Sequence, residues 1–151
     1  MSTKIFVNLP VKDLERSIRF YEAIGGTKND KFSNEQAAAV VFSDAFYVML
    51  LKHEFYSTFT SKPIADANVT SSVLLALSCD DKAAVDAMVE AAASAGGKAD
   101  PGPRQDHGFM YGRSFEDPDG HHWEPMWMDA SAAEQGASAM EQPADATADR
   151  H

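Results

Sequence analysis

The 151-residue chain has few positive charges and no long apolar run. It has 13 lysines and arginines against 23 aspartates and glutamates, a formal net charge of -10. Because phosphate-binding surfaces depend on clusters of Lys and Arg, nucleic acid is excluded as a partner. No apolar run approaches the roughly 20 residues that cross a bilayer, and the first residues lack the apolar core of a signal peptide. We therefore expect a cytoplasmic protein with no membrane partner.

Cysteine is nearly absent as well. The single Cys79 excludes an internal disulfide and a zinc site of the CxxC kind. It follows the apolar run VLLALS, and free cysteine is commonly buried. We interpret Cys79 as a small buried hydrophobic residue rather than a nucleophile.

Aromatic and β-branched apolar residues are missing from Ala130 onward. Such a segment has little apolar surface to offset its ordering entropy. The sequence therefore predicts one folded domain over residues 1–129 and a flexible acidic tail over residues 130–151. The alternative for the tail is a short helix around residues 131–140.

The folded part contains the same order of elements twice. A β-like run at residues 5–11 precedes a helical segment that Asp13 caps and Gly25-Gly26 ends. A second run at 73–79 precedes a helical segment that starts at Asp80-Asp81 and stops at Gly96-Gly97. Further β-like pieces follow each helix, at 37–43 and 46–52, and at 109–117 and 121–129. The pattern predicts two βαβββ modules, at about 4–56 and 72–129, and an α+β fold.

Two strings carry a family resemblance, VNLPVKDLERSIRFYEAIGG near the start and SFEDPDGHHWEPMW near the end. Together they resemble the vicinal oxygen chelate superfamily, which includes glyoxalase I, bleomycin-resistance proteins, fosfomycin-resistance enzymes and extradiol dioxygenases. The match covers residues 4–129. The resemblance implies paired βαβββ modules that form a U-shaped barrel, a homodimer, and a small-molecule site in each concavity.

The resemblance also implies positions for a divalent metal on the first and last strands of each module. These positions fall on Phe6, Leu74 and Glu124, and near Leu50, where the register is free to slip by a residue or two. Phe and Leu have no lone pair to give a cation, and one carboxylate is too few ligands. We therefore expect no metal and no other cofactor, which argues against the metal-dependent activities of the family.

Strand alternation places His122, Glu124 and Met126 on one face of the last strand, and His121, Trp123 and Trp127 on the other. A rebuilt metal site of Glu124 and His122, completed by His53 or by His107, is one alternative. The other is a hydrogen bond between His122 and Glu124, since a buried carboxylate without a partner is costly.

The same alternation predicts the lining of an apolar cleft. Its members come from the first strand and the last strand of each module: Phe6, Asn8, Pro10, Val48, Leu50, Lys52, Leu74, Ala76, Ser78, His122 and Glu124. The alternation of side chains along the strand leaves open whether Tyr111 and Arg113 line this cleft or Met110 does. The candidate ligand-binding residues are Phe6, Asn8, Leu50, Lys52, Leu74, Tyr111, Arg113, His122 and Glu124; for Phe6 and Leu74 the alternative is filled core.

The leading functional hypothesis is a metal-independent glyoxalase/bleomycin-resistance-like protein that binds a small organic molecule in this cleft. The alternative is a lyase or isomerase of the lactoylglutathione-lyase type, with Glu124 as general base assisted by Lys52 or Arg113, or with a metal on the rebuilt site. The sequence leaves open whether the protein is an enzyme. A purely structural role would rest on Trp123, Trp127 and the FYSTF segment, which fit a dimer interface better.

Overall fold

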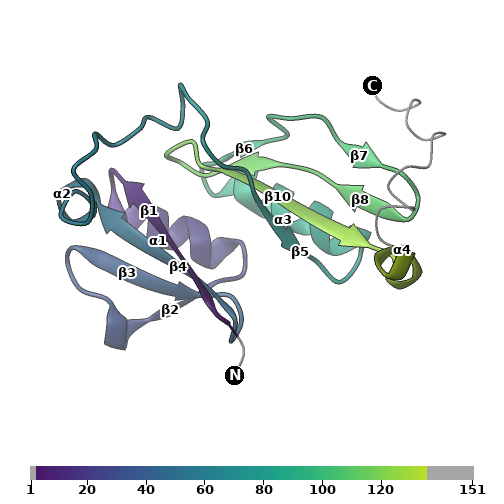
Figure 1. Ribbon diagram of the computed structural model, residues 1–151, viewed down its shortest axis with the longest axis horizontal. Coiled ribbons are helices and arrows are strands. Elements are labelled where there is room, and N and C mark those ends of the chain that lie inside the picture. Colours follow the sequence, from purple (N-terminus) through teal and green to yellow (C-terminus); the bar gives the residue numbers. More distant parts are fainter. Residues whose placement is uncertain (1–2, 136–151) are drawn as a thin grey trace. The chain divides into compact units, whose positions relative to one another are not determined.

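The computed structural model describes residues 3–135. It divides into two compact units (Figure 1). Unit 1 comprises Met1–Ser72 with Asp117–His121, and unit 2 comprises Val73–Glu116 with His122–His151. The predicted tail begins with a helix, α4 (Ala130–Gln135), and residues 136–151 lie outside the described residues.

Unit 1 is a βαβββ module. Its elements are β1 (Ile5–Val11), α1 (Leu14–Ala23), β2 (Thr27–Asn29), a 3-10 turn (Asp30–Phe32), β3 (Ala37–Val41), β4 (Phe46–Lys52) and α2 (His53–Tyr56). The sheet order is β1-β4-β3-β2, with β1 and β4 parallel and the other pairs antiparallel. As predicted, the Asp13 carboxylate caps α1 by accepting from the Arg16 amide at 3.1 Å.

Unit 2 repeats the module with two broken strands. Its elements are β5 (Leu75–Ser78), α3 (Lys82–Ser94), β6 (Lys98–Ala99), β7 (Gln105–Asp106), β8 (Met110–Gly112), β9 (Phe115–Glu116) and β10 (His122–Met128). Strand β10 pairs with β5 in parallel and with β8 and β9 antiparallel. The predicted strand at 109–117 is interrupted at Ser114, whose carbonyl and hydroxyl accept from the amides of Asp100 and Gly102 instead.

The loop between β9 and β10 is a hairpin turn, and its residues Asp117–His121 belong to unit 1. Asp117 is 3% exposed and accepts a hydrogen bond from the Tyr21 hydroxyl at 2.6 Å. It also accepts from the amides of Asp119 and His121. Asp119 accepts from the Lys12 amide at 3.0 Å. Burial raises the pKa of Asp117 above its usual value, although these donors favour the ionised form.

The two tryptophans differ in burial. Trp123 is 2% exposed and belongs to the core of unit 2, which leaves it no surface for the dimer interface suggested from the sequence. Trp127 is half-buried, with the Lys82 ammonium 5.7 Å from its ring centre. In the FYSTF segment, Phe59 is 69% exposed and its ring meets Phe55 edge-on. No helix within residues 3–135 has the length and apolar character to span a membrane.

Candidate functional site

The open face of the unit 2 sheet carries the sequence's strongest candidates. The β5–β10 register pairs Glu124 with Ala76 and Met126 with Ser78. The β8–β10 register pairs Met126 with Gly112. Paired residues point to the same face of a sheet. Alternation thus groups these residues as predicted, and Trp123 and Pro125 of β10 are buried on the opposite face.

A pocket of about 310 Å³ lies on this face, and we call it the Glu124 pocket. Three segments of unit 2 contribute to it: the central strands, the break between β6 and β7, and the break between β8 and β9. The lining residues are Ala76, Gly102, Pro103, Gln105, Met110, Gly112, Arg113, Ser114, Glu124, Pro125 and Met126. The lining is mainly apolar with a few polar groups, as is usual for small-molecule sites.

Glu124 and His122 form a hydrogen-bonded pair at the pocket. The His122 Nε2 lies 3.0 Å from Glu124 Oε2, so the ring donates when Nε2 carries the proton. The Glu124 side chain is 43% exposed and that of His122 is 20% exposed. The arrangement holds a carboxylate in a fixed orientation while leaving it accessible to a ligand.

The side chains of Tyr111 and Arg113 both bond to Asp86 of α3 rather than to Glu124. Tyr111 pairs with Trp127, which places it opposite Glu124, so Met110 lines the pocket and the predicted cleft position of Tyr111 is wrong. The Tyr111 hydroxyl donates to Asp86 at 2.7 Å. Tyr111 is 8% exposed, and burial together with this bond raises the pKa of its hydroxyl.

Arg113 borders the Glu124 pocket, but carboxylates hold its guanidinium. It donates to Asp100 through Nε at 3.0 Å and a second nitrogen at 2.6 Å, and to Asp86 at 2.9 Å. Glu90 lies 3.6 Å away. These bonds raise the pKa of Arg113 and hold the pKa of Asp100 below its usual value. Arg113 is 5% exposed and bonded to these acids, so it is not free to assist Glu124 as the lyase alternative expects.

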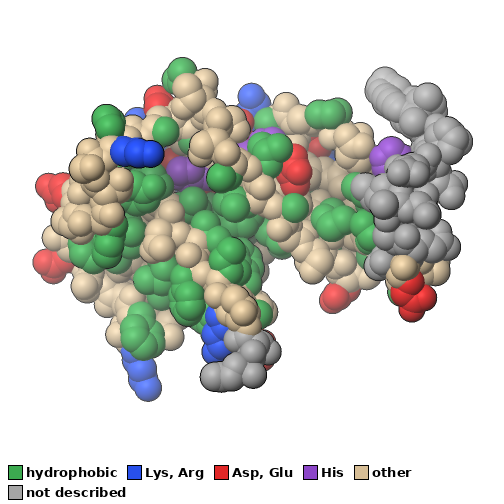
Figure 2. All heavy atoms as spheres, viewed as in Figure 1, with side chains coloured by type: hydrophobic (Ala, Val, Ile, Leu, Met, Phe, Trp, Pro, Cys, Tyr) green, Lys and Arg blue, Asp and Glu red, His purple; other side chains and the backbone are tan. Residues whose placement is uncertain are grey.

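The open face of the unit 1 sheet is apolar and aromatic. Phe6 pairs with Tyr47 and Asn8 with Met49, and the Phe6 and Tyr47 rings stack with centroids 4.7 Å apart. Phe6 is 54% exposed, and hydrophobic side chains gather on the visible face of this unit (Figure 2). This surface is the unit 1 counterpart of the face that carries Glu124.

Leu50 is not on that face. It pairs with Leu9 and is fully buried, so the predicted β4 lining of Val48, Leu50 and Lys52 is wrong by one residue. Lys52 pairs with Val11 on the same side as Leu50. The sequence FYVMLLK is apolar on both faces of the strand, and alternation therefore gives no information about its register.

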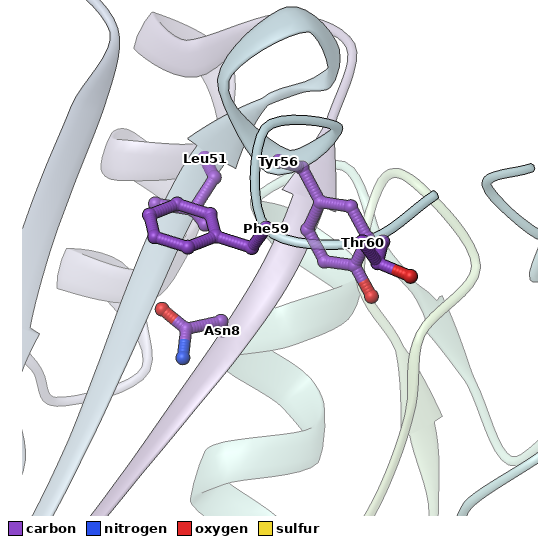
Figure 3. A pocket seen from close by; sticks show the side chains of 5 residues that line it. All are labelled: Asn8, Leu51, Tyr56, Phe59 and Thr60. Carbon is purple, nitrogen blue, oxygen red and sulfur yellow. The ribbon is translucent and has the colours of Figure 1, made fainter. Parts of the chain in front are cut away.

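A second pocket, of about 280 Å³, lies beside Asn8 in unit 1. It is lined by Asn8, Leu51, Tyr56, Phe59 and Thr60. Figure 3 shows the Asn8 amide on β1 and the Phe59 ring beside Leu51, with Tyr56 and Thr60 on the segment that follows β4. Sequence reasoning missed these aromatic residues as pocket lining, although the FYSTF segment was the available signal.

Three further histidines within residues 3–135 have contacts of their own. His53 begins α2 in unit 1 and lines a pocket of about 140 Å³ with Lys12, Asp119 and His121. The His121 Nε2 lies 2.9 Å from the Pro10 carbonyl. His107 contacts Gln105 at 3.1 Å.

The implied divalent metal does not fit the residues present. The registers make Asn8–Met49 the counterpart of Ala76–Glu124, so the fourth repeat-equivalent ligand position is Met49 rather than Leu50. The four positions are then Phe6, Met49, Leu74 and Glu124, and Glu124 supplies their only oxygen donors. Among residues 3–135, no group of three His, Cys, Asp or Glu side chains is placed to hold a metal ion.

Comparison with known proteins agrees with this architecture. The family model described as the Glyoxalase/Bleomycin resistance protein/Dioxygenase superfamily matches residues 5–124. The chain therefore belongs to this superfamily, and the α+β fold predicted from the sequence is confirmed. No curated protein matches the chain.

Three solved structures illustrate the likeness. A hypothetical protein from S. aureus is 26% identical with a TM-score of 0.69, over 84% of this chain and 94% of that one. A glyoxalase/bleomycin resistance protein/dioxygenase family enzyme from Burkholderia phytofirmans PsJN is 19% identical with a TM-score of 0.68, over 84% and 99%. Fosfomycin resistance protein FosX from Mesorhizobium loti is 18% identical with a TM-score of 0.64, over 89% and 98%. The last two likenesses show the fold alone.

Proposed function

We propose that this chain binds a small organic molecule in the Glu124 pocket and does so without a metal ion. The observation that carries the proposal is the Glu124 carboxylate, oriented by His122 at 3.0 Å and partly exposed within a mainly apolar pocket. A volume of about 310 Å³ suits one small ligand, at the lower end of the roughly 300–1,000 Å³ of such sites.

Polar and apolar residues have separate roles in the proposal. Met110, Met126 and Pro103 supply apolar contact area. Glu124 supplies a hydrogen-bond acceptor that fixes the orientation of the ligand, because a charged acceptor makes the stronger bond. His122 keeps that carboxylate from turning out to water.

Ligand binding at this pocket is tested with methyl NMR on protein labelled at methionine. A library of small aromatic and aliphatic molecules should contain compounds that shift the methyl signals of Met110 and Met126. The Met49 methyl, on the open face of unit 1, is the internal control, and M110L and M126L assign the signals. Compounds that shift Met49 alone would place the binding site elsewhere and contradict the proposal.

The metal-independent part has its own test. The purified protein is dialysed against Ni, Zn, Mn and Fe salts, and bound metal is measured. We expect no stoichiometric retention, because three of the four family positions are Phe6, Met49 and Leu74. Metal retained at one equivalent by the wild type and lost by E124A would overturn this part.

A second candidate function is a lyase or isomerase that uses Glu124 as general base. The His122–Glu124 hydrogen bond favours it, because it orients the carboxylate as proton transfer requires. General base catalysis contributes about a hundred- to ten-thousand-fold. Hemithioacetal turnover that falls by that factor in E124Q supports this candidate, and absent turnover or turnover unchanged in E124Q removes it.

We further propose that the protein acts as a cytoplasmic homodimer. Cys79 is free, as suits a reducing compartment. Ile5 and Phe6 in unit 1 are 57% and 54% exposed, and Leu74 in unit 2 is 58% exposed; a subunit interface would cover such large apolar side chains. Sedimentation velocity should give twice the chain mass, and a monomer at all concentrations would contradict the dimer.

A further inference from the structure

The charge around the Glu124 pocket is unbalanced. Asp86, Glu90 and Asp100 lie within 3.6 Å of the Arg113 guanidinium. Arg104 lies 3.9 Å from Asp100. With Glu124, four carboxylates face two guanidinium groups, which leaves two negative charges uncompensated. Arg113 is held by carboxylates and is not available to an anionic ligand. Arg104 is 58% exposed and lies 3.9 Å from Asp100, but its single charge does not offset the remaining acids.

The polar groups at the pocket differ in their availability. The Ser114 hydroxyl already accepts from the Gly102 amide at 3.0 Å. Glu124 has one bond, from His122, and 43% of its side chain is exposed. A carboxylate has about four acceptor sites. The strongest free acceptor of the pocket is therefore Glu124, and a ligand that covers it must donate to it.

The floor of the pocket consists of sheet residues with small side chains or none. Ala76 and Gly112 flank β10 beside Glu124 and Met126. A Cβ atom at Gly112 would lie 3.6 Å from Met126 Cβ and 3.7 Å from Met110 Cε, in ordinary contact with both. The absence of that side chain leaves a flat surface between the two methionines.

The walls favour aromatic ligands. Met110 and Met126 are flexible and polarisable, and thioether sulfur makes favourable contacts with ring edges. No aromatic side chain lines the pocket within the described part of the chain, so no ring of the protein occupies the space that a ligand ring would take. A flat floor between two methionines accommodates a planar ring better than a branched aliphatic group.

We propose that the Glu124 pocket selects a flat aromatic or heteroaromatic molecule that carries a basic nitrogen, protonated at neutral pH. The ring lies on the floor formed by Ala76 and Gly112, between Met110 and Met126. The protonated nitrogen donates to Glu124. This inference rests on the proposed function, and it adds the chemical class of the ligand.

The test uses three naphthalene derivatives that share the ring and carry a cationic, a neutral or an anionic group at its 2-position: naphthalen-2-ylmethylamine, naphthalen-2-ylmethanol and 2-naphthoate. Each is titrated into the full chain while the Met110 and Met126 methyl signals are followed. We expect the ammonium compound to bind at least about tenfold more tightly than the alcohol, since hydrogen bonds to charged groups are the strong ones. The carboxylate should bind most weakly.

Two variants separate a local effect from the net charge of the protein. E124Q keeps an acceptor for His122 and should reduce the affinity of the ammonium compound to that of the alcohol. E22Q removes the same charge from an exposed position on α1 and should leave the series unchanged. An equal loss in E22Q and E124Q would overturn the role of Glu124.

G112A tests the floor. Its methyl group fits without a clash, so the fold should persist, and all three affinities should fall by a similar factor. Unchanged affinities would overturn the placement of the ring. If the alcohol or 2-naphthoate binds as tightly as the ammonium compound, selection for positive charge is wrong while the proposed function stands. If neither these compounds nor the library shifts Met110 or Met126, the proposed function itself fails.

Discussion

Each of the two units is a copy of the βαβββ module, yet the two copies bury side chains of opposite charge. Unit 1 buries the carboxylate of Asp117, which accepts from the Tyr21 hydroxyl and two backbone amides. Unit 2 buries the guanidinium of Arg113, which donates to Asp86 and Asp100. The module therefore accepts a buried charge of either sign, provided that the hydrogen bonds of the charged group are satisfied.

The open faces differ in a related way. In unit 1 the first strand carries the polar group and the last strand the apolar one, as Asn8 beside Met49. In unit 2 the order is reversed, as Ala76 beside Glu124. Only the second arrangement places a carboxylate at this position. A repeated module can therefore keep its hydrogen-bond registers while its two faces acquire different ligand chemistry.

The largest effect should follow from removing the buried cation. R113M removes both short hydrogen bonds to Asp100 and leaves it only Arg104 at 3.9 Å, so it should lower the free energy of unfolding by about 3 kcal/mol. The value lies at the lower end for a broken buried pair, because the Asp86 side chain is 47% exposed and can turn to water. Both tryptophans lie in unit 2, so urea unfolding followed by tryptophan fluorescence reports on this unit.

R113K is the control for that prediction. It keeps the charge but loses the two-pronged bond to Asp100, so its loss should be smaller than that of R113M. A loss below about 1 kcal/mol in R113M would show that the ion pair has little importance for unit 2.

The corresponding change in unit 1 should cost less. Y21F removes one hydrogen bond to Asp117, at 2.6 Å, and should lower stability by about 1.5–3 kcal/mol. Hydrogen exchange of the α1 amides measures it, since unit 1 has no tryptophan. Y47F is the matched control, because the Tyr47 hydroxyl donates to the Asp44 carbonyl at an exposed site. Equal effects of Y21F and Y47F would contradict the role of the buried bond.

Lowering the pH should affect stability in opposite directions through the carboxylates of the two units. The pKa of Asp117 is raised in the folded state, so ionising it costs stability, and that cost disappears as pH falls through the raised pKa. The pKa values of Asp86 and Asp100 are lowered, so their contribution is present above the unfolded-state pKa and is lost as pH falls through the lower folded-state values.

D117N isolates the first of these effects. The stability of the wild type relative to D117N should rise as pH falls from the raised folded-state pKa to the unfolded-state pKa, by at most about 1.4 kcal/mol per pH unit. Chemical denaturation at a series of pH values measures it. A difference that is flat or falls toward acid would show that the Asp117 pKa is not raised.

The smallest effect should be the same in both units. Gly25 and Gly96 follow α1 and α3 with φ of +117° and +102°, and a Cβ at either position would meet nothing within 4 Å. G25A and G96A should therefore each cost about 1 kcal/mol through backbone strain alone. Thermal unfolding of the two variants compares them, and a large difference would reveal a contact specific to one helix end.

Much of the fold could be predicted from local signals. The N-cap residues Asp13 and Asp81, the glycines after each helix and the order of strands all follow from short-range patterns. The open face of β10 was also predictable, because His122 and Glu124 alternate with buried Trp123 and Pro125. Where polar and apolar residues alternate along a strand, the alternation shows which side chains point to the open face of the sheet.

The remaining details depend on contacts that one sequence does not contain. Strand β4 is apolar from Phe46 to Leu51, so the choice between Leu50 and its neighbours required the observed pairing with β1. The orientation of Arg113 depends on Asp86 in the middle of α3, a charged residue on a largely apolar helix. The floor at Gly112 was missed because a glycine in a strand has no side chain to mark a face.

The hairpin turn between β9 and β10 has a consequence for biosynthesis. Asp117 and Asp119 complete the core of unit 1 beside Tyr21 and Lys12, yet they are translated after most of unit 2. At about 5–20 residues per second, the ribosome adds this turn roughly 2–10 s after Ser72. Until then the Tyr21 hydroxyl lacks its carboxylate partner. The nascent N-terminal unit thus remains incomplete, and its final folding must wait for the C-terminal half of the chain.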